Sequence, residues 1–440
     1  MSVISYKKFC VKPGGKLTGR LRVPGDKSIS HRSIMLGALA DGVTRIRGFL
    51  EGEDSLNTLR AFQAMGVQIE GPVEGEVIIH GVGIDGLKEP LEVLYVGNSG
   101  TSMRLLSGIL AAQSFSSILT GDESLTVRPM KRVIAPLKQM GANIQGSQDD
   151  KPPLSIQPVP RLKGMTYEMP VASAQVKSCL LLAGLFAEGE TVIIEPQSGL
   201  TRDHTERMLT GFGYEVASQG ARISLQGRRR LTATTVDVPA DLSSAAFFLV
   251  GASIAPGSDI VLEHVGVNPT RTGVLDILKL MGADITLFNQ RKAGGEPVAD
   301  IRVRHANLQG ITVPERLVPL AIDEFPAIFV AAACASGKFV LTGAEELRVK
   351  ETDRIAAMAE GLKTLGVDAK PTSDGMKIRG GKIGSGTVAS HGDHRIAMAF
   401  TMASLRASGP IKVNDCSNVA TSFPNFVELA HTAGLNINAS

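Results

Sequence analysis

The segment LRAFQAMGVQI, residues 59–69, decides the fold, because it has the pattern of an amphipathic helix that ends at a glycine and leads into a strand. The same pattern returns five more times, roughly 70 to 85 residues apart, as LKQMGANI, MLTGFGYEV, LKLMGADI, LKTLGVDA and AHTAGLNI. Its glycines are Gly66, Gly141, Gly213, Gly282, Gly366 and Gly434. Glycine fits the left-handed backbone that closes many helices. Six copies therefore predict six structural repeats.

A second repeated pattern lies between these segments: a polar capping group, a helix that is apolar nearly all round, a turn and a β-rich strand. Its copies are DKSISHRSIMLGALA, NSGTSMRLLSGILAA, SAQVKSCLLLAGLFA, DLSSAAFFLVGASIA, DEFPAIFVAAACASG and DHRIAMAFTMASLRA. A helix without a polar face must be buried on all sides, and three such helices would fill one domain.

These two patterns predict an α/β (α+β) protein of two similar domains, each built from three repeats. The predicted domains are residues 24–240, and residues 1–23 together with 241–440. The chain would then cross between them near Val23 and near Pro239. The last repeat is short, and we expect the strand-like residues 7–12 to complete it.

Composition limits the classes of function. The chain has 440 residues, of which 43% are hydrophobic, enough for two cores. A net charge of +3, with no long basic tract, argues against a general nucleic-acid binder. The first residues, MSVISYKKFC, lack an apolar signal core, and no window resembles a membrane span. We expect a soluble cytoplasmic protein that binds neither nucleic acid nor membrane.

The four cysteines are far apart in sequence, and none forms the closely spaced pair of a zinc ribbon or a redox motif. Cys179 and Cys334 lie inside apolar helical runs. We expect these two to be buried thiols in a reducing compartment.

The predicted inner helices should present their N-termini, which carry unpaired amides and a partial positive charge, at one end of each domain. Basic side chains recur near these and other helix starts: Lys27, Arg32, Arg104, Arg128, Arg202, Lys350, Arg354 and Arg395. Any one of them could be a solvated surface charge, as we expect for Arg228, Arg229 and Arg230. Their recurrence favours a site for a substrate with several negative charges.

Two acids among these cations are candidates for proton transfer. Asp323 opens an inner helix, so helix capping is its alternative role, and Glu351 lies in RVKETDR, where an ion pair is the alternative. No metal-ligand cluster, serine–histidine–aspartate order or nicotinamide motif competes. GDKSISHR also lacks the spacing of a P-loop.

Nine ordered motifs resemble those of the enolpyruvylshikimate-phosphate synthase family across essentially the whole chain. They are GDKSISHR, NSGTSMRLL, RPM, SAQ, LTRDHTERM, DLSSA, IDEFP, RVKETDRI and GDHRIAMAF. The resemblance implies an inverse α/β barrel of the enolpyruvyl transferase type: two domains, each of three βαβαββ units, with the active site in the cleft between them. Residues 24–240 would then be the domain on the side of shikimate 3-phosphate.

The activity that the resemblance implies is transfer of the enolpyruvyl group of phosphoenolpyruvate to the 5-hydroxyl of shikimate 3-phosphate. Phosphate leaves by addition and elimination, in a step of the shikimate pathway to chorismate and the aromatic amino acids. The partners would be these two small molecules, the enzyme would be a monomer, and no metal or organic cofactor would be needed.

The resemblance also implies the site residues. Those implied to bind shikimate 3-phosphate are Lys27, Ser28, Arg32, Ser173, Gln175, Ser198, Arg202, Asp323 and Lys350. Those implied to bind phosphoenolpyruvate are Lys27, Asn98, Gly100, Arg128, Gln175, Arg354 and Arg395. The implied catalytic residues are Lys27, which touches both substrates, Asp323 as the base for the attacking hydroxyl, and Glu351 as the acid that protonates the methylene carbon.

Three positions depart from the family pattern. Ala174 stands where many members have a second serine, Thr421 where many have a lysine, and Leu105 where a proline is common. These changes resemble the divergent branch, whose members are often less sensitive to the herbicide glyphosate. Gly100, in contrast, is the residue of the sensitive pocket, so the two signals point in opposite directions.

Two other functions compete. The sister transferase, which acts on UDP-N-acetylglucosamine, usually carries a reactive cysteine on a mobile loop, and residues 121–132 contain none. A noncatalytic anion-binding relative would be expected to have lost its acids, whereas Asp323 and Glu351 are both present.

Overall fold

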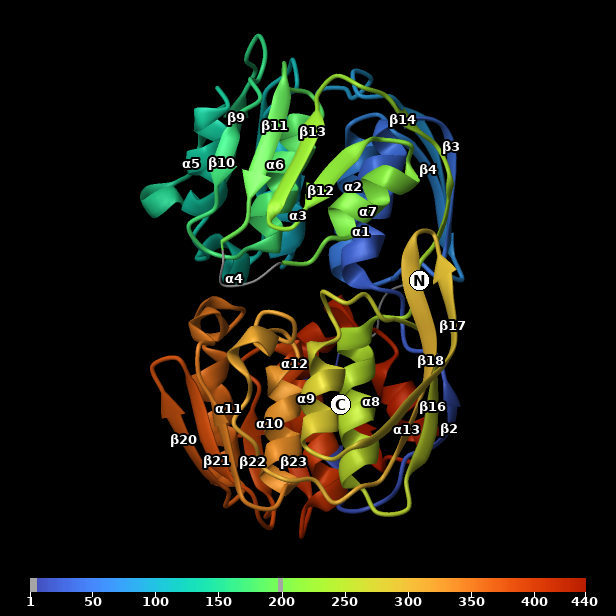
Figure 1. Cartoon of the computed structure of the whole chain (residues 1–440), viewed down its shortest axis with the longest axis vertical. Helices are drawn as coiled ribbons and strands as arrows, with labels where there is room; N and C mark the ends of the chain where they lie inside the picture. The colour runs from blue at the N-terminus through green and yellow to red at the C-terminus, as the bar shows by residue number, and fades with distance from the viewer. Residues whose placement is uncertain (1–5, 197–200) are drawn as a thin grey trace. The chain divides into compact units, whose positions relative to one another are not determined.

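The computed structural model describes residues 6–196 and 201–440. Its contacts divide the chain into two compact units (Figure 1). Unit 1 consists of Met1–Pro24, Pro239–Lys292 and Glu296–Ser440, and unit 2 of Gly25–Val238 and Ala293–Gly295. The two main divisions fall next to Val23 and Pro239, the crossing points suggested by the repeat pattern.

The strands of the described residues form six separate sheets of three to five strands, three in each unit. Each sheet belongs to one repeat, which confirms the six predicted repeats and the mixed α/β class. None of the six sheets closes into a barrel among the described strands.

Unit 2 contains the first three repeats. The first has α1 (Lys27–Leu39), β3 (Ala40–Arg47), α2 (Glu53–Ala64), β4 (Gln68–Val73), β5 (Glu76–Val82), β14 (Leu231–Thr232) and β15 (Thr235–Asp237). The second has β6 (Leu94–Tyr95), α3 (Gly100–Leu110), β7 (Ser117–Thr120), α4 (Glu123–Thr126), α5 (Lys131–Gln139), β8 (Asn143–Gln145) and β9 (Leu154–Gln157). The third has β10 (Thr166–Glu168), α6 (Ala174–Gly184), β11 (Glu190–Ile194), α7 (His204–Gly211), β12 (Val216–Gln219) and β13 (Arg222–Gln226).

Unit 1 contains the other three repeats. The fourth has β2 (Thr18–Leu21), α8 (Leu242–Ile254), β16 (Asp259–Gly266), α9 (Gly273–Leu280), β17 (Asp284–Ala293) and β18 (Glu296–Arg304). The fifth has α10 (Phe325–Cys334), β19 (Lys338–Leu341), α11 (Arg354–Thr364), β20 (Asp368–Thr372) and β21 (Gly375–Arg379). The sixth has β22 (Gly386–Ala389), α12 (His394–Ala403), β23 (Ile411–Asn414), α13 (Phe426–Ala433), β24 (Ile437–Ala439) and β1 (Lys8–Val11).

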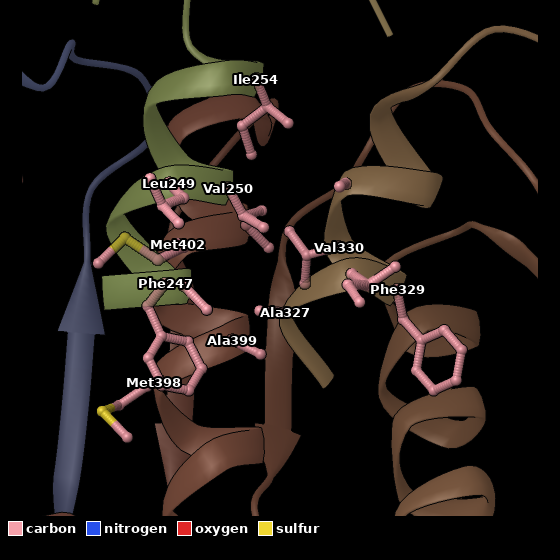
Figure 2. Packing of buried hydrophobic residues seen from close by; sticks show 14 of the residues in the cluster. Phe247, Leu249, Val250, Ile254, Ala327, Phe329, Val330, Met398, Ala399 and Met402 are labelled. Atoms are coloured by element: carbon pink, nitrogen blue, oxygen red, sulfur yellow. The ribbon is translucent and has the colours of Figure 1, made fainter. Parts of the chain in front are cut away.

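The inner helices form the core of each unit, as their apolar sequences require. Every residue of α8 is buried, and α8, α10 and α12 contact one another. Their side chains pack together, among them Phe247 of α8, Val330 of α10 and Met398 of α12 (Figure 2). The apolar area removed from water here is the main favourable term in folding of the unit.

The six repeated glycines lie at helix ends in the left-handed region, with φ between 76° for Gly213 and 114° for Gly434. A residue with a Cβ is strained at such angles, so glycine is the residue that lets each outer helix turn back into its sheet. The glycine pattern therefore has the predicted structural cause.

Three sheets are completed by strands from distant parts of the chain, among them the sheet of the fourth repeat, in which β2 pairs in parallel with β16. Strand β1 lies between β23 and β24, with Phe9 opposite both Val413 and Ala439, which confirms that the N-terminal stretch completes the sixth repeat. Strands β14 and β15 pair in parallel with β3 of the first repeat. The sequence pattern predicted neither the pairing of β2 nor that of β14 and β15.

The other expectations about surface and core have mixed outcomes. Cys179 is buried, but Cys334, the last residue of α10, is partly exposed, because it lies where the helix leaves the core. Arg228, Arg229 and Arg230 form exposed ion pairs with Asp85, Glu215 and Asp41, in agreement with a surface role. Within the described ranges, no helix is both long and apolar enough to span a membrane.

Candidate active site

Side-chain caps begin five of the six inner helices. In unit 2, Asp26, Ser99 and Ser173 accept hydrogen bonds from backbone N–H groups in the first turns of α1, α3 and α6. In unit 1, Asp241 and Asp393 do the same for α8 and α12. These caps stabilise the first turns of the helices whose N-termini the sequence analysis predicted to bind anions.

Lys27 is the first residue of α1, and its ammonium forms an ion pair with the buried carboxylate of Asp54 in the first turn of α2. The pairing fixes the lysine, whose side chain remains partly exposed. The sequence analysis did not predict a role for Asp54 in the site. An acid in the first turn of a helix is ordinarily explained by its favourable interaction with the helix dipole.

His31 reports on the electrostatics beside Lys27. Burial, followed by the charges of Lys27 and Arg32, holds the pKa of His31 well below its usual range, although Asp26 opposes the effect. The ring is therefore neutral at neutral pH, and it bonds the hydroxyl of Thr58 at 2.8 Å. His31 serves as a buried link between α1 and α2, not as an acid.

Asn98 and Arg128 belong to one hydrogen-bonded chain. Arg128 donates to the side-chain oxygen of Asn98 at 2.7 Å, and the Asn98 amide donates to Asp122 Oδ2 at 2.7 Å. Asp122 in turn caps α4. The predicted donor residues Asn98 and Arg128 are thus brought together by the loop that surrounds α4.

Gly100 is the first residue of α3, and a Cβ added there would lie 2.8 Å from Nη1 of Arg104 and 3.3 Å from Nη1 of Arg128. Arg104 donates to Oε1 of Gln175 at 2.8 Å. Gln175 donates to Thr101 at 3.1 Å. Gly100 therefore lies beside both arginines, and Arg104, which the resemblance did not assign to the site, joins Gly100 to Gln175.

Arg32 is almost fully buried in α1. It donates to the hydroxyls of Thr205 and Ser178, both at 2.7 Å, and to the carbonyl oxygen of Ser28 at 2.9 Å. These bonds fasten α1 to α6 and to the start of α7. Arg202 precedes α7 and is partly exposed, whereas Ser198 lies outside the described residues.

The predicted acids of unit 1 gather around Arg354, whose side chain is 1% exposed. Its Nη1 lies 3.3 Å from Asp323 Oδ1, its Nη2 lies 2.6 Å from Glu351 Oε2, and its Nε lies 2.7 Å from Asp393 Oδ2. Burial alone would lower the pKa of Arg354, but the three carboxylates outweigh burial and raise it above its usual value. Arg354 thus remains a cation that orients three acids.

Asp323 is not the N-cap residue of α10, so the structure does not give it the capping position that the sequence suggested. Helix α10 starts at Phe325, next to Pro326, and its N-cap residue is Glu324, whose amide donates to Ala321 O in the preceding turn. The Asp323 carboxylate is directed instead at Arg354 and at the ammonium of Lys350, 3.4 Å away. The ion-pair role suggested for Glu351 is present, as its bond to Arg354 shows.

Arg395 joins the same cluster from the first turn of α12. It donates to the carbonyl oxygen of Asp323 at 3.1 Å, and its Nη1 lies 3.8 Å from Glu324 Oε1. Asp393 accepts from the Arg395 amide at 2.9 Å. The sequence did not predict that Glu324 and Asp393 would lie beside Arg354 and Arg395, because acids are common at helix starts.

Among the described residues, no group of three or more histidine, cysteine, aspartate or glutamate side chains is arranged to hold a metal ion. The residues around Lys27 and Gly100 in unit 2, and those around Arg354 in unit 1, instead provide cations, helix N-termini and carboxylates. Such a set can bind anions and transfer protons.

This combination of repeats, anion-binding helix starts and paired acids defines a transferase of the enolpyruvyl type. A family model described as EPSP synthase (3-phosphoshikimate 1-carboxyvinyltransferase) matches residues 11–429, and the chain belongs to this family.

Individual relatives agree. The chain is 64% identical over 432 residues to the 3-phosphoshikimate 1-carboxyvinyltransferase of Methylococcus capsulatus, covering 98% of each chain. It is 66% identical over 429 residues to that of Alkalilimnicola ehrlichii, covering 97% of this chain and 96% of the relative. The solved EPSP synthase of Acinetobacter baumannii superposes with a TM-score of 0.89 at 59% identity, covering 99% of this chain and 100% of the other.

Proposed function

We propose that this chain transfers the enolpyruvyl group of phosphoenolpyruvate to the 5-hydroxyl of shikimate 3-phosphate and releases phosphate. Membership of the EPSP synthase family supports the reaction. One observation of the structure carries the assignment of roles: Arg354 orients two candidate proton-transfer acids, Asp323 and Glu351, through bonds of 3.3 and 2.6 Å.

Addition is the first step. Asp323 accepts the proton of the attacking hydroxyl as the new carbon–oxygen bond forms, and Glu351 donates a proton to the methylene carbon of the donor. Lys350 and Arg354, both within 3.4 Å of Asp323 Oδ1, stabilise the carboxylate in the ionised form that a base requires.

Elimination reverses the two roles. The carbon–oxygen bond to phosphate breaks, and Asp323 gives the proton that it accepted to the departing phosphate oxygen. Glu351 recovers the proton from the methyl carbon, and the double bond forms again. The leaving phosphate carries negative charge, which fixed cations can stabilise without reorganisation. Lys27, Arg128 and Arg395 are the proposed cations, and Arg354 and Arg395 are proposed to clamp the donor.

Shikimate 3-phosphate is assigned to a set of residues centred on unit 2. Ser173, as the cap of α6, lies at a helix N-terminus that favours a phosphate group. The remaining proposed ligands in unit 2 are Lys27, Ser28, Arg32, Gln175, Ser198 and Arg202. Asn98 and Gly100 are proposed to line the donor position, where the missing side chain of Gly100 leaves the backbone accessible.

We also propose a monomer in a reducing cytoplasm. The four cysteines are free thiols, which fits such a compartment. Light scattering in solution tests the oligomeric state.

The decisive experiment measures phosphate release from phosphoenolpyruvate with shikimate 3-phosphate, and separately with UDP-N-acetylglucosamine. We expect release with the first acceptor only. Release with the second would assign the chain to the sister reaction, and release with neither would support a noncatalytic relative.

A further inference from the structure

Unit 2 contains a buried ion cluster that the proposed mechanism does not use. Lys177, one turn beyond the start of α6, has its ammonium 2.7 Å from Glu206 Oε1 and 3.2 Å from Glu195 Oε2. The side chains of Lys177, Glu195 and Glu206 are 1%, 2% and 8% exposed. They come from α6, from the residue after β11, and from the first turn of α7.

Such a cluster is weak evidence for stability, because the cost of removing three charges from water offsets most of their attraction. The balance of charge here is not even, since one ammonium faces two carboxylates. Glu206 Oε2 also lacks a hydrogen-bond partner within the described part of the chain. Burial raises the pKa of Glu206, although Lys177 opposes this shift. Stability alone therefore does not account for this cluster.

The cluster holds every polar group of Thr201. Glu195 Oε1 accepts from the Thr201 amide at 2.8 Å and from its hydroxyl at 2.5 Å. Lys177 donates to the Thr201 carbonyl oxygen at 3.3 Å. Three bonds to buried charged groups fix both the backbone and the side chain of this residue, and charge-assisted bonds are stronger than neutral ones.

Arg202 follows Thr201 directly, and a second anchor lies just beyond it. Asp203 accepts from Arg207 at 2.8 Å, while Thr205 donates to Ser178 at 2.8 Å and accepts from Arg32 at 2.7 Å. Arg202 is thus held on both sides by bonds to α1, α6 and α7.

We propose that Lys177 and Glu195 are positioning residues which fix Thr201 and so preorganise Arg202 for shikimate 3-phosphate. The inference rests on the proposed function, in which Arg202 binds that substrate. A segment that is already ordered loses less conformational entropy on binding. Fixing the backbone of one residue corresponds to about a five- to thirty-fold gain in affinity.

The test compares two buried threonines of unit 2. Thr201→Val removes a hydroxyl that donates to Glu195 while conserving the shape of the side chain. Thr191→Val is the matched control, because the Thr191 hydroxyl is buried in β11 and has no hydrogen-bond partner among the described residues. Thr201→Ser keeps the hydroxyl and should restore wild-type binding.

Calorimetric titration with shikimate 3-phosphate and steady-state phosphate release provide the readouts. We expect Thr201→Val to weaken binding of shikimate 3-phosphate about five- to thirty-fold, with kcat and the KM for phosphoenolpyruvate changed less than about twofold at saturating acceptor. Thr191→Val and Thr201→Ser should both bind as the wild type does. A merely structural role would lower the yield of folded protein without this separation of KM from kcat.

Glu195→Gln provides a second test of the inference if Thr201→Val does not fold. The amide can still accept from Thr201 but loses the charge that holds Lys177, so weaker binding of the acceptor is again expected. Unchanged affinity in these variants, or equal weakening in Thr191→Val, would overturn the inference. Failure of the proposed function is distinguishable, because the wild-type enzyme would then release no phosphate with shikimate 3-phosphate.

Discussion

Replacing Asp323 by asparagine tests the proposed base directly. Asparagine has nearly the same shape but cannot accept the hydroxyl proton, so kcat should fall by about 10² to 10⁴, the usual value of general acid–base catalysis. The fold should tolerate the change, because Arg354 retains bonds to Glu351 and Asp393 at 2.6 and 2.7 Å. Lys350 loses the carboxylate at 3.4 Å, but this side chain is 22% exposed and can be solvated.

The matched control for this variant is Asp353→Asn. Asp353 caps α11 and bonds Arg348, close in sequence to the acids, and asparagine is an equally good cap. We expect its kcat to stay within about twofold of the wild type, since it removes a charge of the same sign without removing a proton acceptor. Phosphate release at saturating substrates provides the rate, and thermal unfolding shows whether each variant is folded. If Asp323→Asn retains more than about a tenth of the wild-type kcat, Asp323 is not the base.

Four further outcomes are expected. Glu351→Gln should also lower kcat by about 10² to 10⁴, and turnover near the wild-type rate would remove Glu351 from the role of acid. Gly100→Ala should raise the inhibition constant of glyphosate by a larger factor than it raises the KM for phosphoenolpyruvate. The reason is that the new methyl group competes with the longer ligand for the space beside Arg104 and Arg128. Equal factors for the two constants would refute the steric argument. Shikimate 3-phosphate should tighten the binding of phosphoenolpyruvate, which calorimetry measures, and reduce the radius of gyration of the protein, which small-angle scattering measures. Independent binding of the two substrates with an unchanged radius of gyration would contradict the coupling. Cys179, whose pKa burial raises to about 12, should stay unalkylated by iodoacetamide at pH 8 in the folded enzyme, because the thiolate is the nucleophile; rapid labelling before unfolding would show an accessible thiol.

The repeats could be predicted because they depend on local chemistry. Gly66 and its five equivalents end helices for a reason that lies in one residue, the missing Cβ, and the inner helices are apolar along their whole length. The unpredicted features all join distant parts of the chain. Strand β15 pairs with β3 across roughly 190 residues, and no periodicity encodes which edge a short strand will choose.

The candidate site shows the same contrast. Lys27, Arg128 and Arg354 could be found because basic residues recur at helix starts. Asp54 and Asp393, the partners of Lys27 and Arg354, could not be assigned in advance, since a helix-start acid has the same local pattern whether it caps or pairs with a distant cation. Asp323 was ambiguous for this reason, and Pro326 resolves it by placing the start of α10 two residues beyond the acid.

The environment of Arg354 links donor binding to proton transfer. If phosphoenolpyruvate binds Arg354, its carboxylate must compete with the carboxylates already there. Asp393 is fully buried and bonds two nitrogens of the guanidinium, whereas Glu351 is 24% exposed and bonds one. Asp323 is 14% exposed and is also held by Lys350 at 3.4 Å. Exchange should therefore fall on Glu351, which would leave Arg354 as the donor arrives.

A carboxylate that loses its cation beside an incoming anion binds a proton more readily, and the proposed acid needs that proton for addition. Glu351→Gln removes the competing charge from Arg354, so this variant should have a lower KM for phosphoenolpyruvate as well as a lower kcat. A KM that rises instead would mean that Glu351 assists donor binding, and the link between exchange and protonation would have to be abandoned.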